Sequence, residues 1–303
     1  MSTPAASAAS DTPAVPIAPA LIAVTGATGR IGGAVAALLH EGGAPLRLLL
    51  RDPSRTPRWA RDAPSVEVAV AQYDDGEAAR AALAGVDVLL MVSASESADR
   101  LLQHRTFIDA AAAAGVRHVV YTSFLGAAAD AIFTLARTHW ATEEHLRASG
   151  MGFTLLRDSF YLDFLPDLAV DGVIAGPAGT GRVGAVARED VARSAAAVLA
   201  DLAAGESRHD GAVYELTGPR ALSLSDVAAI LTAAGRPTVY RQESVEEAYA
   251  SRSVYGAPDW QVDAWVSTYT AIASGALDRV THDVERLTGR RPLGLAELLA
   301  GRP

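Results

Sequence analysis

The chain has 303 residues, half of them hydrophobic and a fifth charged, with a net charge of −9. This balance is typical of a globular protein with a sizeable core, and it offers no global basic field for a nucleic acid. The sequence contains no cysteine, lysine or asparagine, which excludes disulfides, thiolate catalysis and any reaction that needs a lysine amine.

The N-terminal segment, residues 1–17, is rich in Ala, Ser, Thr and Pro, without a basic start or a continuous apolar stretch. We interpret it as a disordered tail and not as a signal peptide. No stretch of the chain approaches the roughly 20 apolar residues that cross a bilayer. We therefore expect a cytoplasmic protein with a small-molecule substrate and no membrane or nucleic-acid partner; the sequence leaves a homodimer open.

Residues 18–157 alternate short apolar runs with amphipathic, alanine-rich stretches. The runs predict strands, which are apolar throughout when helices cover both faces of a sheet: Leu21–Thr25, Leu46–Arg51, Val66–Val70, Asp87–Val92, Val116–Thr122 and Phe153–Arg157. Helical spacing predicts helices at Gly32–His40, Gly76–Leu83, Asp99–Ala114 and Ala136–Ser149. Several end near a glycine suited to a left-handed cap: Gly42, Gly85, Gly115 and Gly150. The alternation predicts an α/β dinucleotide-binding domain with a doubly wound parallel sheet of Rossmann type.

After Arg157 the rhythm changes, and we expect residues 158–303 to form a smaller, helix-rich substrate-binding lobe. Residues 172–184 are rich in Gly, Ala and Pro and predict a loop with a short extended piece. The later predicted elements are a helix at Arg188–Ala203, a strand at Val213–Leu216, a helix at Ser225–Ala234 capped by Ser223 or Ser225, a strand at Thr238–Arg241 and a terminal helix at Leu295–Ala300.

A glycine-rich loop joins the first predicted strand to the first predicted helix. Gly26, Gly29 and Gly32 have the spacing G-x-x-G-x-x-G. In such a loop the first glycine permits a tight turn, the second lets a pyrophosphate approach the backbone, and the third lets helix pack on strand. The alternative, a glycine-rich turn without a ligand, fits less well with a loop that opens a long βαβ series.

The end of the second predicted strand bears on which dinucleotide binds. An acidic residue there favours the ribose 2′-hydroxyl of NAD, whereas an arginine favours the 2′-phosphate of NADP. Arg51 occupies the last strand position, Asp52 follows it, and Arg30 supplies a further positive charge from the loop. We therefore expect NADPH, with NADH less favoured; the alternative is that Arg51 is a solvated strand end paired with Asp52.

Six stretches resemble the NmrA-like group of atypical short-chain dehydrogenases, and in particular its NADPH-dependent quinone oxidoreductase type 2 branch. They are Thr25–Gly32, Leu50–Pro53, Tyr73-Asp74, Tyr121–Ser123, the His-x-x-Thr-Glu stretch His139–Glu143, and Thr154–Arg157. The resemblance implies cofactor contacts near Arg157–Tyr161 and at Gly26, Ala27, Thr28, Gly29, Arg30, Ile31, Arg51, Ser93, Ala94 and Ser95. Relatives often have an aspartate near the adenine where this chain has Gln72; Asp74 or Asp75 is expected to replace it.

The chain lacks the usual catalytic set of short-chain dehydrogenases, Tyr-x-x-x-Lys with an asparagine. Hydride transfer to an electrophilic acceptor demands less, because the cofactor carries the chemistry and the protein orients the two rings. The candidate catalytic residues are Ser123, as a hydrogen-bond donor to the substrate, and His139 with Glu143, as a proton relay at i,i+4 spacing. A surface pair without a chemical role is the alternative for His139 and Glu143, and we assign no metal site.

Aromatic side chains follow the sixth predicted strand. Phe160 and Tyr161 are candidate substrate-binding residues that stack on nicotinamide or on a flat substrate; a plug between the lobes is the alternative. Tyr121 is expected in the core. Trp260, Trp265 and Tyr269 are expected to pack in the core or between the lobes, with a pocket wall or a dimer contact as the alternative.

Three functions are compatible with these observations. The first is an NADPH-dependent oxidoreductase acting on a quinone or a similar conjugated, electron-poor acceptor. The second is a non-catalytic NAD(P)-sensing regulator of the NmrA type, and the third is a tailoring reductase or isomerase of secondary metabolism. The His139–Glu143 stretch favours an enzyme, and the first reading is preferred.

Overall fold

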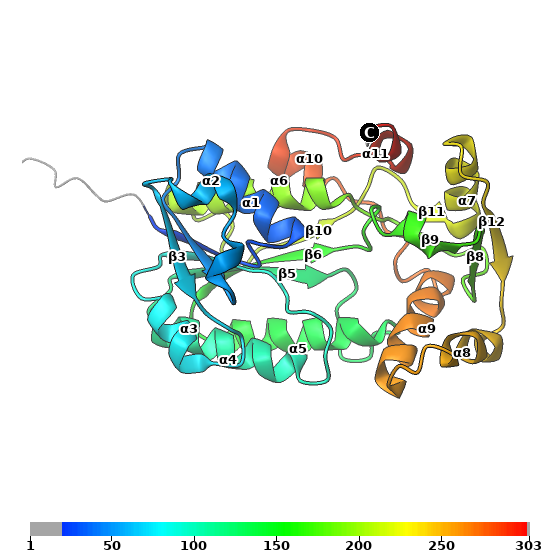
Figure 1. Ribbon diagram of the computed structural model, residues 1–303, viewed down its shortest axis with the longest axis horizontal. Helices are drawn as coiled ribbons and strands as arrows, with labels where there is room; N and C mark the ends of the chain where they lie inside the picture. Colours follow the sequence, from blue (N-terminus) through cyan, green and yellow to red (C-terminus); the bar gives the residue numbers. More distant parts are fainter. Residues whose placement is uncertain (1–19, 302–303) are drawn as a thin grey trace, which may run out of the picture.

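One seven-stranded parallel sheet forms the centre of the computed structural model, which describes residues 20–301 (Figure 1). The strands follow the order β10-β6-β5-β4-β1-β2-β3, and every neighbouring pair is parallel. They are β1 (Ile22–Thr25), β2 (Leu46–Leu50), β3 (Val66–Val70), β4 (Val88–Met91), β5 (His118–Phe124), β6 (Gly152–Asp158) and β10 (Val213–Leu216). The predicted doubly wound fold is confirmed, because the chain starts mid-sheet and builds outward in both directions.

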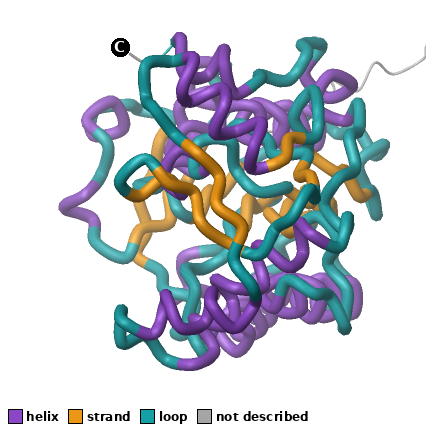
Figure 2. Tube along the Cα trace, turned by 90° about the vertical axis from the view of Figure 1, so that its right-hand side faces the viewer, coloured by secondary structure: helices purple, strands orange, loops and turns teal. Residues whose placement is uncertain are grey.

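Helices cover both faces of this sheet. One face carries α1 (Arg30–Glu41), α2 (Arg58–Arg61), α6 (Arg188–Ala203) and α10 (Asp283–Thr288), and the other carries α3 (Gly76–Ala82), α4 (Arg100–Ala113) and α5 (Thr134–Ala148) (Figure 1). Successive side chains of a strand point to opposite faces, so Ile22 and Val24 pack with α1 and α6, whereas Ala23 packs with α3 and α4. Figure 2 shows the strands between two helical layers. Within residues 20–301 no helix combines the length and apolarity needed to cross a bilayer.

A second, smaller unit lies at one end of the main sheet, on the right in Figure 1. It contains a three-stranded sheet of β7 (Ala169–Val170), β8 (Val173–Gly176) and β12 (Val239–Gln242), and a pair formed by β9 (Arg182–Val183) and β11 (Leu222–Ser223). Its helices are α7 (Leu224–Ala233), α8 (Val245–Ser253), α9 (Asp259–Ala273), α11 (Leu295–Ala300) and the 3-10 helix η2 (Leu165–Leu168). Ile174, Val227 and Ile272 belong to a core that also includes Phe124 of β5 and Ala136 of α5, so this core holds the unit together and attaches it to the main sheet.

The expected boundary between the dinucleotide-binding domain and the smaller lobe, at residue 157, does not coincide with the end of the main sheet. β10 extends that sheet, with Val213 opposite Leu155 and Leu216 opposite Asp158, and α6 shares the core of α1. The change of composition after Arg157 predicts that β10 and α6 belong to the smaller lobe. This prediction is wrong for β10 and α6. The chain leaves the sheet after β6, builds β7 to β9, and then returns; composition marks the departure, but the return depends on long-range strand pairing.

The predicted elements agree with the observed ones to within two residues at each end. Several short elements are additional, because four residues or fewer carry no periodic signal: η1 (Pro53–Arg55), α2, β7, β9, β11 and η2. The helices α8, α9 and α10 also had no predicted bounds. Gly85, Gly115 and Gly150 have the expected left-handed conformation, with φ of 76°, 81° and 81°. Gly42 does not: its φ is −76°, and Gly43 takes the left-handed position at 79°, because α1 continues to Glu41. Ser223, and not Ser225, caps α7.

A buried ion pair joins α5 to β6. The carboxylate of Glu143 is 1% exposed and accepts two hydrogen bonds from Arg157, at 2.9 Å from Nε and 2.6 Å from Nη2. The hydroxyl of Ser123, on β5, donates to the same carboxylate at 2.5 Å. This network fixes the position of α5 relative to two neighbouring strands, and it raises the pKa of Arg157 through the hydrogen bonds from its guanidinium to Glu143.

Asp158, the last residue of β6, is buried next to Tyr161. The Tyr161 hydroxyl donates to Oδ2 of Asp158 at 3.0 Å, and Oδ1 has no hydrogen-bond partner in the described part of the chain. Burial raises the pKa of Asp158 to about 8. The side chain is therefore a neutral carboxylic acid in the folded protein at pH 7.

We expect Glu143→Ala to lower the free energy of unfolding by about 3–5 kcal/mol, because the partly buried Arg157 guanidinium loses its counter-charge. Urea denaturation followed by circular dichroism at pH 7 measures this loss. Glu144→Ala is the matched control: its carboxylate is 52% exposed, pairs with Arg147 at 3.4 Å, and should contribute less than about 1 kcal/mol. Equal effects of the two substitutions would contradict the structural role of Glu143.

We expect Asp158→Asn to change the pH dependence of stability. Wild-type Asp158 ionises near pH 4 in the unfolded chain but only near pH 8 when folded, so its contribution to stability falls as pH rises from 4 to 8. The variant cannot ionise at this position, and its free energy of unfolding should therefore rise relative to wild type between pH 5 and pH 8. Urea midpoints at several pH values measure the slope; the exposed Asp130→Asn is the control and should keep the wild-type slope.

Candidate functional site

The glycine loop after β1 forms a backbone cradle at the N-terminus of α1. Gly26 has a φ of 62°, which favours glycine, and its carbonyl accepts a hydrogen bond from the Gly29 N–H at 2.8 Å. A Cβ on Gly32 would lie 2.4 Å from the Thr25 carbonyl oxygen, so only glycine lets α1 approach β1 this closely. The N-cap residue Gly29 provides no side-chain cap, which leaves the first N–H groups of α1 for an anion.

The predicted loop residues differ in what they present to this cradle. Gly26, Thr28, Gly29, Arg30 and Ile31 line a cleft of about 810 Å³ that follows the carboxyl ends of the strands. Ala27 does not line it, because its side chain is 1% exposed and belongs to the core beneath the loop. The loop thus offers backbone groups and the exposed Arg30 side chain to a phosphate-bearing ligand.

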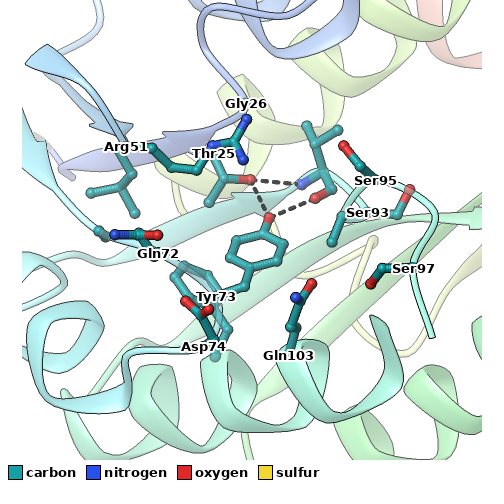
Figure 3. A pocket seen from close by; sticks show the side chains of 15 residues that line it. Thr25, Gly26, Arg51, Gln72, Tyr73, Asp74, Ser93, Ser95, Ser97 and Gln103 are labelled. Carbon is teal, nitrogen blue, oxygen red and sulfur yellow. Dashed lines mark hydrogen bonds between the residues drawn. The ribbon is translucent and has the colours of Figure 1, made fainter. Parts of the chain in front are cut away.

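Arg51 follows β2 and faces a pocket at one end of the cleft (Figure 3). Its guanidinium is exposed and forms no ion pair within residues 20–301. Asp52, the alternative partner considered from the sequence, instead accepts from the Ser54 N–H at 2.9 Å and caps η1. The alternative, a pairing of Arg51 with Asp52, is therefore wrong, and the Arg51 side chain is available to a phosphate.

Of the two acidic residues considered for the adenine end, Asp74 and Asp75, only Asp74 lines this pocket. Asp74 lines it together with Gln72, whereas the Asp75 carboxylate caps α3 by accepting from the Ala78 N–H at 2.9 Å. Tyr73 lines the same pocket, and its hydroxyl lies 2.7 Å from Thr25 Oγ1 and 2.5 Å from the Val92 carbonyl oxygen (Figure 3). These contacts fix the pocket wall to the ends of β1 and β4.

The loop after β4 lines both the pocket and the cleft, with Ser93, Ala94 and Ser95 in both. Two hydrogen bonds fix the backbone of this loop to β5 and α4: the Ser93 N–H donates to Thr122 Oγ1, and the Ala94 N–H donates to His104 Nε2, each at 2.8 Å. The two serine hydroxyls therefore lie on a fixed loop beside the cradle.

His139 lines the cleft, and its hydrogen bonds within the described residues do not involve Glu143. Its Nε2 accepts from Arg100 Nη2 at 2.9 Å, and its Nδ1 lies 2.9 Å from the Tyr121 hydroxyl. Because Arg100 can only donate, a neutral His139 must carry its proton on Nδ1 and donate it to Tyr121. Burial and the neighbouring Arg100 and His104 hold the pKa of His139 well below its usual value.

The expected proton relay is therefore corrected. His139 and Glu143 share one face of α5 and both are buried, but they hydrogen-bond to different partners, Arg100 and Tyr121 for the first, Ser123 and Arg157 for the second. The surface-pair alternative is equally wrong. Helical spacing places the two side chains on the same face, and only the surroundings decide where each one points.

Ser123 and the aromatic residues line the inner part of the cleft. The Ser123 proton is directed at Glu143, so Ser123 presents oxygen lone pairs to the cleft. Phe160 packs edge to face on Phe124 and Phe133, each with ring centroids 5.0 Å apart. Tyr161 also lines the cleft, so Phe160 and Tyr161 both form its wall. Phe160 in addition packs on the core that extends into the second unit, whereas Tyr161 packs on the core of the main sheet.

Several lining residues lie outside the set expected from the sequence. Trp265, on α9, forms part of the cleft wall, which was the alternative to the preferred packing role. Tyr269 on the same helix is buried as expected, as is Tyr121 on β5. Arg100 and Arg188 also line the cleft. No motif marks these residues, because they reach the cleft from helices whose placement depends on tertiary packing.

Comparisons with known proteins agree with this geometry. The sequence model of the NAD(P)H-binding family matches residues 26–202. The chain is 35% identical to quinone oxidoreductase 2 of Escherichia coli, over 91% of this chain and 96% of that protein. The crystal structure of an NADPH-dependent quinone oxidoreductase from the same organism, complexed with NADPH, superposes with a TM-score of 0.81 at 34% identity, over 92% of this chain and 98% of that one.

Two further relatives cover most of the chain. An NAD(P)H azoreductase of Xenophilus azovorans is 32% identical over 91% of this chain and 96% of its own length. A (4-alkanoyl-5-oxo-2,5-dihydrofuran-3-yl)methyl phosphate reductase of Streptomyces griseus is 32% identical over 89% and 93%. The cradle at Gly26–Gly32, the fold and these similarities lead to one conclusion, which confirms the resemblance to the quinone oxidoreductase type 2 branch: the chain belongs to the NAD(P)H-binding family.

Proposed function

We propose that the protein is an NADPH-dependent oxidoreductase that reduces a quinone or a similar conjugated, electron-poor acceptor. The observation that carries the proposal is one cleft that runs from Arg51, past the glycine cradle, to a wall of aromatic side chains. A phosphate-binding end and a flat apolar end in one cleft suit a dinucleotide and a planar acceptor held side by side. The E. coli and X. azovorans relatives are named for reactions of this type.

The residues present fit the cofactor. A Cβ at Gly29 or Gly32 would press on backbone oxygens, at 3.1 Å and 2.4 Å, so the glycines maintain the close turn that a pyrophosphate needs. Arg51, without an acidic partner in the described chain, is placed to bind the 2′-phosphate, and Asp74 and Gln72 border the adenine end. When bound, NADPH supplies the hydride, that is, two electrons and one proton.

The protein's own contribution is to hold and shield the acceptor. Phe160, Tyr161 and Trp265 form flat walls that orient a planar ring and exclude water. Asp158, buried directly before this aromatic wall in the chain, is neutral because burial raises its pKa to about 8, so it adds no negative charge to oppose reduction of the acceptor.

The second proton that completes a hydroquinone comes, in this proposal, from water. The His139 proton is held by Tyr121 and the Ser123 proton by Glu143, so neither is free to transfer. Because the chain has no lysine, the tyrosine–lysine acid that ketone reduction normally employs is absent. An acceptor that is already electrophilic fits such a site better than an unactivated ketone.

We expect Arg51→Ala to raise the dissociation constant of NADPH by about 10- to 100-fold, the value of a hydrogen bond between charged groups, with NADH changed less than about threefold. Titration of cofactor fluorescence measures both constants. Arg55→Ala is the matched control, since Arg55 lies on η1 outside the cleft and should leave both constants as they are. Equal weakening of NADPH and NADH would contradict the 2′-phosphate assignment.

The proposed activity is tested by following NADPH oxidation with a panel of simple quinones. Turnover of at least one of them supports an oxidoreductase of this class. Tight NADPH binding without turnover of any quinone in the panel would contradict the proposal and favour a sensing role.

A further inference from the structure

Arg100 is a buried guanidinium without a carboxylate partner. The residue is 4% exposed and lines the cleft from the start of α4. Within residues 20–301 no aspartate or glutamate lies within ion-pair distance of it, although the protein as a whole carries a charge of −9. Buried charges are normally paired, because removal from water costs much of the hydration energy.

Three neutral groups hold this guanidinium in one orientation. Its Nε donates to the Ala94 carbonyl at 3.0 Å, its Nη1 to Thr138 Oγ1 at 3.2 Å, and its Nη2 to His139 Nε2 at 2.9 Å. A guanidinium has five N–H donors, so one on each terminal nitrogen is left over. Arg100 is thus a fixed cation with two donors still to be used.

The groups around Arg100 do not neutralise it. His104 is neutral, because burial and Arg100 itself lower its pKa to about 3. Glu143, on the adjacent helix α5, is engaged by Arg157 and Ser123. Glu96 is the acidic residue among those that line the cleft, and it is exposed on the loop after β4. Because no acidic side chain of the described residues neutralises Arg100, we expect an anionic group of a ligand in the cleft to pair with it.

Arg100 lines the same cleft as the glycine cradle, on the side formed by α4 and α5. The pocket that contains Arg51 and Asp74, at the 2′-phosphate end, does not include Arg100. Arg188, a further arginine of the cleft, has its guanidinium over the Tyr161 ring, 4.9 Å from the ring centroid, at the start of the helix that packs on α1. Arg100 instead lies across the cleft beside His139 on α5, near the aromatic wall.

We propose that Arg100 recognises an acidic group on the acceptor, so that the preferred acceptor is a conjugated planar molecule with a sulfonate, carboxylate or phosphate. This inference rests on the function proposed above and specifies its substrate class. The S. griseus relative is named as the reductase of such a molecule, a dihydrofuranone that bears a phosphate. His139 is then a positioning residue: its Nε2 fixes the guanidinium, and it does not itself contact the acidic group.

The test compares two acceptors that differ in one charged group, 1,2-naphthoquinone and 1,2-naphthoquinone-4-sulfonate. We expect wild type to show the lower KM for the sulfonate. Arg100→Gln should raise that KM by about 10- to 100-fold, the range for a charged hydrogen bond, while KM for the neutral quinone and the NADPH dissociation constant change less than about threefold. Arg105→Gln, an exposed arginine on the same helix, is the matched control and should change none of the three.

His139 provides a second readout. His139→Gln retains a hydrogen-bond acceptor for Arg100 and should preserve most of the preference for the sulfonate, whereas His139→Leu should abolish it, with kcat for the neutral quinone affected less than KM for the sulfonate. A purely structural role of His139 would shift both acceptors together in both variants and would overturn the positioning role.

A binding experiment separates this inference from the proposed activity. Calorimetric titration of the wild-type NADPH complex with naphthalene-1-sulfonate and with 1-naphthol requires neither turnover nor a variant. Tighter binding of the sulfonate supports anion recognition even if no quinone is reduced, in which case only the proposed activity fails. Equal binding of the two compounds overturns the inference. Weaker NADPH binding by Arg100→Gln with unchanged discrimination also overturns it, and assigns the anion to the cofactor.

Discussion

The packing of α1 against the end of β1 is the contact on which the cleft depends. At Gly32 a single Cβ would overlap the Thr25 carbonyl oxygen, so the helix can begin directly above the strand only with glycine there. This brings the uncapped N–H groups of α1 to the carboxyl edge of the sheet, where the loops after β2, β4, β5 and β6 also emerge. A parallel sheet collects all these loops at one edge, and the cleft is the space between them.

Charge is distributed unevenly along that cleft. Glu143 and Arg157 neutralise each other in the interior and act as a structural link between α5 and the sheet. Arg51 and Arg100 both line the cleft and have no acidic partner within the described residues. Unpaired arginines in the cleft of an acidic protein suit anionic ligands, and in the proposed function both contribute to recognition more than to stability.

Neutral titratable groups surround the reacting part of the cleft. His104 and His139 lose their charge through burial beside Arg100, and Asp158 is protonated through burial at the end of β6. Since the chain also lacks lysine, it cannot form the tyrosine–lysine pair that serves as the general acid in most short-chain dehydrogenases. Orientation, exclusion of water and the intrinsic reactivity of the acceptor therefore account for catalysis in the proposed reaction.

The sequence by itself determined the parallel α/β sheet, the glycine cradle and the strand-end position of Arg51. Each of these follows from local pattern: apolar runs of strand length, helical spacing between them, and three glycines where strand meets helix. The absence of lysine and asparagine was also decisive, because it removed one mechanism without any structural information.

Only the tertiary structure decided the roles of side chains whose partners lie far away in the chain. In the structure β10 pairs with β6 of the main sheet, and α6 packs on that sheet. Glu143 bonds to Arg157 and not to His139, and Arg100 bonds to His139, 39 residues later in the chain. Spacing along a helix shows which face a side chain shares, but its partner is set by the element packed on that face. Hydrogen bonds and burial, which fix tautomer and pKa, arise from that packing and have no counterpart in local sequence.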